Sequence, residues 1–133
     1  GFDVKKSELH GMSQRGGSVS RDVRFGARVH SPMIPFGEVD YLVVLEADQQ
    51  PLVQDWLRAG GVQIGPDAVD AAALPGRRCL TVALLGALSR HLAALPESHW
   101  MDALAACFPP RALEDNRRAF AIGRNARTGE GNA

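Results

Sequence analysis

The stretch that most constrains the fold is a short apolar run, Tyr41-Leu-Val-Val-Leu45, bounded by Asp40 and Glu46. Five apolar residues between two acidic ones predict a β-strand buried on both faces, as in a parallel sheet covered by helices. Residues just past such a strand lie in the crevice where α/β proteins bind ligands. Glu46 is therefore a candidate site residue. We expect Asp48 instead to cap a helix that carries Pro51 in its first turn.

Strand and helix patterns alternate along the chain, which predicts an α/β fold with a helix-rich C-terminal half. In the second strand, alternation places Val19, Arg21, Val23 and Phe25 on one face. Gly86 lies inside an apolar helix, so we expect close packing against another element there. Strands are expected at 3–9, 18–25, 28–31 (after a tight turn at 26–27) and 62–64, and helices at 49–58 (ended by Gly60-Gly61), 81–95, 97–108 and 112–124.

The most polar loop of the chain is segment 7–17, Ser-Glu-Leu-His-Gly-Met-Ser-Gln-Arg-Gly-Gly. Gly11 and Gly16-Gly17 permit positive φ and the close approach of a ligand or another backbone. A loop of this kind between strands is a common place for a site, although a plain polar turn fits the composition equally well. With Gln14 and Arg15, its backbone N–H groups can present donors to an anion, which alone is weak evidence.

Composition restricts the possible partners. The 133 residues are enough for one domain, and 15 basic residues balance 15 acidic ones, which gives no electrostatic argument for nucleic acid or an anionic membrane. The chain has no run of 18 apolar residues, so the sequence does not predict a membrane-spanning helix. Cys79 and Cys107, both in apolar surroundings, are expected to be buried free thiols, as suits a reducing cytoplasm.

Self-contained catalysis and metal binding are not predicted. The chain has no Gly-x-Ser-x-Gly motif of a nucleophilic serine, and no Cys-x-x-Cys motif of a zinc or iron–sulfur site. The four histidines are scattered along the chain, so no catalytic residue and no metal ligand is assigned. They are His10, His30, His91 and His99.

Segment 8–18 resembles the hallmark loop of the gamma-type subunit or domain of 2-oxoacid:ferredoxin oxidoreductases. Segments 31–35, 37–46, 82–88 and 116–123 resemble the same family in the same order. The resemblance covers residues 2 to about 125 and is closest to the indolepyruvate version, through segments 65–79 and 96–100.

The resemblance implies a three-layer α/β/α domain of Rossmann or flavodoxin-like type over residues 1–126, with a disordered tail over 127–133. Family members begin earlier, with a strand, a glycine-rich turn and a helix. This chain opens on Gly1, so we expect that this N-terminal segment is missing from it.

The resemblance also implies a function, the oxidative decarboxylation of a 2-oxoacid with coenzyme A to acyl-CoA and reduced ferredoxin. Thiamine diphosphate and 4Fe-4S clusters would belong to a catalytic alpha subunit, with no cofactor bound by this chain alone. This chain would meet that subunit at the active site or coenzyme A crevice, with Gln14 and Arg15 making polar contacts and segment 31–35 adding an apolar lip. The residues assigned to this interface are His10, Met12, Ser13, Gln14, Arg15, Gly16, Gly17, Ser31 and Glu46.

Two alternatives stay open. Pyruvate and 2-oxoglutarate versions of the family share this type of subunit, and nothing in the chain recognises the oxoacid directly. In a different class, the chain would be a stand-alone flavodoxin-like module for nucleotide binding or scaffolding. Its glycine loop would then hold a flavin or nucleotide phosphate.

Overall fold

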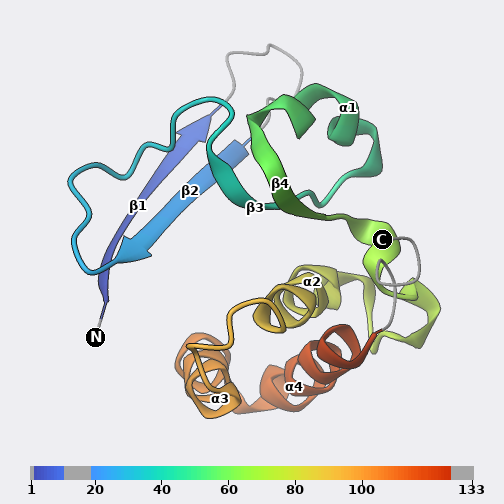
Figure 1. Ribbon diagram of the computed structural model, residues 1–133. Coiled ribbons are helices and arrows are strands. Elements are labelled where there is room, and N and C mark those ends of the chain that lie inside the picture. The colour runs from blue at the N-terminus through green and yellow to red at the C-terminus, as the bar shows by residue number, and fades with distance from the viewer. Residues whose placement is uncertain (1, 11–18, 127–133) are drawn as a thin grey trace.

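The computed structural model describes residues 2–10 and 19–126 (Figure 1). A hairpin of two strands lies at the left of Figure 1, two further strands lie in the middle, and three helices lie below them. The strands are β1 (Asp3–His10), β2 (Val19–Gly26), β3 (Val39–Val43) and β4 (Leu57–Ile64). The α-helices are α1 (Gln50–Val53), α2 (Leu80–Ser89), α3 (Glu97–Cys107) and α4 (Pro110–Asn125).

Strands β3 and β4 form a parallel pair, in which Tyr41 lies opposite Val62 and Val43 opposite Ile64. The connection between them carries α1, so the unit is a β–α–β crossover, the connection that parallel strands need. The α/β class is thus confirmed, with parallel strands and a helical C-terminal part, in keeping with a Rossmann or flavodoxin-like domain.

The apolar core lies between this parallel pair and the helices α2 and α4. Partly buried Val43 and Val62 of the strands pack against the fully buried Ala83, Leu84 and Ala119 of the two helices. A second cluster joins α2, α3 and α4 around Val82, Leu104 and Phe120. Burial in this part of the chain therefore comes mostly from helix packing.

Strand β3 is less buried than its sequence predicts. Val39 and Val44 are buried, but Tyr41 and Leu45 are exposed, so the prediction of burial on both faces is wrong. The reason is that the core cluster of α2 and α4 packs against Val43 but does not reach Tyr41 or Leu45 within the described part of the chain. An apolar run shows that a strand can be buried, but it does not show how many elements of the fold cover that strand.

The helix after β3 is shorter than predicted. Helix α1 has four residues and carries Pro51 in its first turn as expected, and a 3-10 turn then leads into β4 at Leu57. Asp48 is not its cap. Asp48 lies inside a preceding 3-10 turn whose N-cap is Glu46, and no side chain caps that turn.

Gly60 and Gly61 lie within β4, and the prediction that they end a helix is wrong. The register shifts at this point, because Val39 lies opposite Leu57 while Tyr41 lies opposite Val62. Gly60 has φ of +80°, which glycine adopts without strain. The glycine pair therefore lies at an irregularity in the pairing of β3 and β4, where the positive φ of Gly60 needs the same backbone freedom as a helix end.

Strand β2 pairs antiparallel with β1, and the predicted return strand at 28–31 is wrong. Segment 27–36 is held instead by side chains of the hairpin. An oxygen of the Asp3 carboxylate accepts the N–H of Val29 at 2.9 Å, and an oxygen of the Asp22 carboxylate accepts the N–H of Ile34 at 3.2 Å. These side chains satisfy backbone groups that a third strand would have satisfied.

The predicted alternation in β2 is confirmed over its described side chains, and the apolar face points outward. Val23 and Phe25 are exposed, whereas Asp22 and Arg24 on the other face are half-buried and bonded to segment 27–36. The hairpin thus covers its polar face and leaves its apolar face open.

Proline residues mark the helix starts in the C-terminal part. Pro96 precedes α3 and Pro110 begins α4, close to the predicted limits. Helix α2 ends at Ser89, six residues earlier than predicted, and turns fill the gap before Pro96. In the described part of the chain, no helix is both long and apolar enough to cross a membrane.

The close approach predicted at Gly86 is confirmed. A Cβ at Gly86 would overlap the carbonyl oxygen of Phe120, and a Cβ at Gly123 would overlap that of Ala83. Helices α2 and α4 therefore meet backbone to backbone. The contact is closed by Ser89, whose hydroxyl donates to the Gly86 carbonyl at 2.6 Å and accepts from Arg124 at 2.7 Å.

Candidate functional site

The glycine-rich loop connects the two strands of the hairpin. His10 at the end of β1 lies opposite Val19 at the start of β2, so residues 11–18 join the strands at this end. The predicted interface residues Met12, Ser13, Gln14, Arg15, Gly16 and Gly17 lie outside the described residues, as does the side chain of His10. Their roles stay predictions.

Ser31 lies in segment 27–36, on the polar face of the hairpin. Its hydroxyl accepts the N–H of Met33 at 3.2 Å, and Arg24 donates to the carbonyls of Ser31 at 3.1 Å and Met33 at 2.9 Å. The hydroxyl of Ser7 contacts the Met33 sulfur at 4.0 Å. Ser31 therefore helps to fix the loop on the hairpin.

The proposed apolar lip, segment 31–35, runs along β2 toward the end that carries residues 11–18. Its first residue bonds to Arg24 and its fourth, Ile34, bonds to Asp22, which is closer to Val19. Met33 exposes about half of its surface (48%). The lip and the glycine loop thus belong to one arm of the molecule.

One carboxylate of the hairpin is perturbed. The hydrogen bond from the Val29 N–H, assisted by Lys5, lowers the pKa of Asp3 below its ordinary value of 3.8, against the opposing effect of desolvation. The carboxylate form of Asp3 therefore favours the observed arrangement of segment 27–36.

Glu46 is separate from these residues. It follows β3, is exposed, and lines a cavity of about 430 Å³ with Leu45, Ala71, Leu74, Arg77, Arg78 and Leu80. Ser31, the other predicted site residue whose side chain the structure describes, does not line this cavity. The position past a parallel strand, predicted from the sequence, is confirmed.

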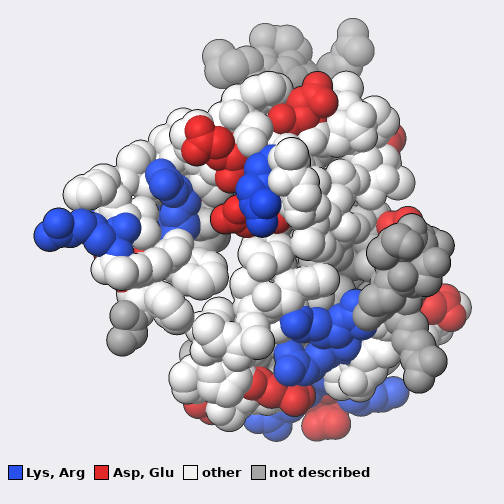
Figure 2. All heavy atoms as spheres, viewed as in Figure 1, with Lys and Arg blue, Asp and Glu red and all other residues white. Residues whose placement is uncertain are grey.

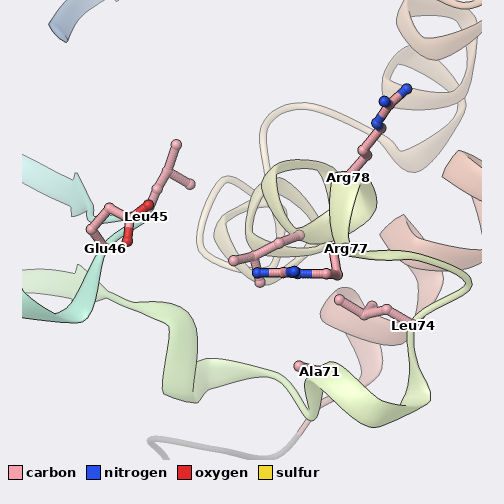
Figure 3. Close-up of a pocket in the computed structure, with 7 residues that line it drawn as sticks. Leu45, Glu46, Ala71, Leu74, Arg77 and Arg78 are labelled. Carbon is pink, nitrogen blue, oxygen red and sulfur yellow. The ribbon is translucent and has the colours of Figure 1, made fainter. Parts of the chain in front are cut away.

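Two arginines of this cavity were missed by the sequence analysis. In Figure 3 the side chain of Arg77 extends toward Glu46, whereas Arg78 points away from it. Among the described residues, neither guanidinium has a hydrogen bond or ion pair. Both precede α2, where positive charge opposes the helix dipole, and this mismatch is a signal that could have found them.

The cavity has the chemistry of a small anion site with apolar walls. The Arg77 guanidinium can hold a carboxylate or phosphate, Glu46 can accept from a nearby hydroxyl, and Leu74 and Leu80 offer apolar contact. In the described residues no three His, Cys, Asp or Glu side chains gather as metal ligands.

Cys79 is buried as predicted, whereas Cys107 is exposed and its predicted burial is wrong. The reason is that α3 buries only Leu104 completely, which leaves the rest of that helix accessible.

Comparison with known proteins decides the family. Residues 1–75, more than half of the chain, match the family described as pyruvate ferredoxin/flavodoxin oxidoreductase. The chain belongs to this family. The predicted relationship to the gamma-type subunits of 2-oxoacid:ferredoxin oxidoreductases is confirmed.

Its similar relatives carry one name, indolepyruvate oxidoreductase subunit IorB. The protein from Thermococcus kodakarensis is 29% identical over 162 residues, which cover 92% of this chain and 80% of the relative. The Pyrococcus horikoshii protein is 28% identical with the same coverage. The Methanothermobacter thermautotrophicus protein is 52% identical over 45 residues, which cover 34% of this chain and 22% of the relative.

Proposed function

We propose that this chain is a subunit of an indolepyruvate ferredoxin oxidoreductase. The observation that carries the proposal is the similarity to subunits named IorB over 92% of the chain, supported by family membership. A protein named as a subunit acts with other chains, so we expect a hetero-oligomer with a catalytic alpha subunit.

In the proposed reaction an aryl 2-oxoacid is decarboxylated oxidatively with coenzyme A, and ferredoxin receives the electrons, in the cytoplasm. Thiamine diphosphate and 4Fe-4S clusters would be held by the catalytic subunit, where they supply carbanion stabilisation and electron transfer. The proposed role of this chain is to complete the active site or coenzyme A crevice, with Gln14 and Arg15 as its polar contacts.

The geometry of the hairpin supports this role. Residues 11–18 stand at one end of an arm whose strands pair over their whole length, and segment 27–36 is bonded along that arm. Strand pairing fixes the positions of His10 and Val19, the two residues that flank this segment. Such support lowers the entropy lost when the segment binds.

The test is reconstitution with the catalytic subunit of an indolepyruvate oxidoreductase. We expect thiamine- and coenzyme-A-dependent reduction of a viologen dye, fastest with arylpyruvates, and at least a tenfold loss of turnover or affinity in Arg15→Ala. Arg111→Ala, at an exposed position of α4, is the matched control. Equal behaviour of the two variants would contradict the role of Arg15, and faster reaction with pyruvate or 2-oxoglutarate would correct the substrate.

The cavity beside Glu46 favours a second candidate, the stand-alone nucleotide-binding module. Its test is calorimetric titration of the chain with flavin mononucleotide and adenosine monophosphate. Two results together would favour this candidate. The chain would bind a nucleotide and lose that binding in Arg77→Ala, and it would not bind the catalytic subunit. No heat with either nucleotide would exclude it.

A further inference from the structure

The cavity beside Glu46 lies between the carboxyl end of β3 and the first turn of α2 (Figure 3). Leu45 and Glu46 follow β3 directly and line one side, and Arg77 and Leu80 line the other. Open α/β sheets bind ligands in the crevice beyond the carboxyl ends of their strands. The cavity volume of about 430 Å³ also lies within the range of small-molecule sites, about 300–1,000 Å³. Both its position and its size therefore suit a small molecule.

The apolar part of this cavity is held in place by the core. Leu74 and Leu80 are half-buried and pack against the core cluster of α2 and α4. The 3-10 turn that begins at Ala71 is capped by Asp70, whose carboxylate accepts the N–H of Ala72 at 3.0 Å. An apolar group of a ligand would therefore meet a preformed surface, which reduces the entropy lost on binding.

The polar part of the cavity carries one positive and one negative group. In Figure 3 Arg77 extends toward Glu46, yet among the described residues neither side chain forms a hydrogen bond or an ion pair. The Glu46 side chain does not cap the 3-10 turn that it precedes, and Arg77 lies before α2, where positive charge opposes the helix dipole. Folding thus explains neither charge, whereas a ligand with two opposite charges would explain both.

The overall charge of the protein does not select the ligand. Figure 2 shows basic and acidic side chains on the same face of the molecule, in keeping with the 15 basic and 15 acidic residues of the chain. A balanced surface gives little long-range attraction for either an anion or a cation. The charge of the ligand is therefore decided by the groups inside the cavity.

The geometry points to a free apolar α-amino acid as the ligand of this cavity. Its carboxylate would bind the guanidinium of Arg77, and its ammonium group would donate to the carboxylate of Glu46. Its side chain would lie against Leu74 and Leu80. A simple anion would be repelled by Glu46 and a simple cation by Arg77, so only a ligand with both charges is attracted by both residues. This site goes beyond the proposed function and does not depend on it.

The experiment is an NMR titration of the full, isotope-labelled chain with L-phenylalanine. We expect saturable shifts of the backbone amides of Ala71, Arg77 and Leu80, which line or border the cavity. Two analogues test the charges of the ligand. N-acetyl-L-phenylalanine lacks the ammonium group and 2-phenylethylamine lacks the carboxylate, and each should bind at least about tenfold more weakly.

Variants test the charges of the protein. Arg77→Gln and Glu46→Gln should each raise the dissociation constant for L-phenylalanine by at least about tenfold, because each removes one charge-assisted hydrogen bond. Arg111→Gln and Glu114→Gln make the same changes at exposed positions of α4 and are the matched controls. Both controls should bind within about twofold of wild type.

The outcomes are independent of the reconstitution with a catalytic subunit. The absence of saturable shifts, shifts confined to amides away from the cavity, or equal binding by all four variants would overturn the amino-acid site and leave the proposed function in place. Binding of N-acetyl-L-phenylalanine as tight as that of L-phenylalanine would assign the cavity to a simple anion and would also overturn the proposal.

Discussion

Helices α2 and α4 bury their contact residues completely, and the β1–β2 hairpin leaves its apolar face in water. Ala83, Leu84, Ala119 and Phe120 are all 0% exposed, whereas Val4 and Val23 keep more than half of their surface. Both regions have a good apolar pattern. The helical part satisfies that pattern by packing within the chain, whereas the apolar face of the hairpin stays exposed. The two regions should therefore respond differently to the same kinds of substitution.

The largest difference is expected for truncation of phenylalanine. Phe120→Ala should lower the free energy of unfolding by about 3–5 kcal/mol, because it leaves a cavity among α2, α3 and α4. Phe25→Ala should cost less than about 1 kcal/mol in the free chain, because that ring is partly in water already. Urea denaturation followed by circular dichroism measures both, and similar costs would break the comparison.

Adding a methyl group sharpens the same contrast. Gly123→Ala should destabilise the protein by about 3 kcal/mol, because its Cβ would overlap the Ala83 carbonyl and force the helices apart. Gly76→Ala is the control, since no atom lies within 4 Å of a Cβ there and its backbone is extended. Melting temperatures of the two variants should separate clearly, and coincident melting curves would argue against the backbone contact.

A smaller effect is expected at the polar end of the helix contact. Ser89→Ala removes a buried hydroxyl that bonds Gly86 and Arg124, which should cost about 1–2 kcal/mol. Ser98→Ala, at an exposed position of α3, should change the unfolding free energy by less than about 0.5 kcal/mol. The denaturant midpoint is the readout, and a neutral Ser89→Ala would mean that the bond contributes nothing.

The smallest effect concerns the covered face of the hairpin and depends on pH. Because the pKa of Asp3 is lowered in the folded protein, its stabilising contribution is present above its ordinary value of 3.8 and is lost as the pH falls through the folded value. Hydrogen-exchange protection of the Val29 amide should therefore be constant above the ordinary value of 3.8 and fall as the pH is lowered below it in wild type.

In Asp3→Asn the same protection should vary less over this range, because the substituted side chain does not titrate. Asp102→Asn, on exposed α3, serves as the control and should follow wild type. Protection that is independent of pH in all three proteins would show that the carboxylate of Asp3 does not hold segment 27–36.

The elements that could be predicted from the sequence are those marked by residues whose effect on the backbone does not depend on distant partners. Pro96 and Pro110 each remove a backbone donor, which fixes the starts of α3 and α4. Gly86 inside a helix indicated a close approach because a helix interior disfavours glycine. Asp3 to Leu9 was predicted as a strand, and the structure adds His10.

The predictions of structure fail where a sequence pattern does not define which other segment packs against or pairs with an element. Alternation in β2 identified its two faces, but which face is covered depends on bonds made by segment 27–36, such as that between Asp22 and Ile34, 12 residues apart. Gly60-Gly61 suits an irregularity within a strand as well as a helix end, and the choice depends on pairing with β3. Arg77 and Glu46 are 31 residues apart and line one cavity only through the fold.

The separation between hairpin and core has an evolutionary consequence. Because Val4, Val23 and Phe25 belong to neither core cluster, substitutions there should alter the free chain's stability little. These positions can therefore change in evolution without compensating changes in the helical core. Sequence differences between related proteins should therefore accumulate in the β1–β2 hairpin. Gly86, Gly123 and Phe120 should change less, because helix packing constrains them.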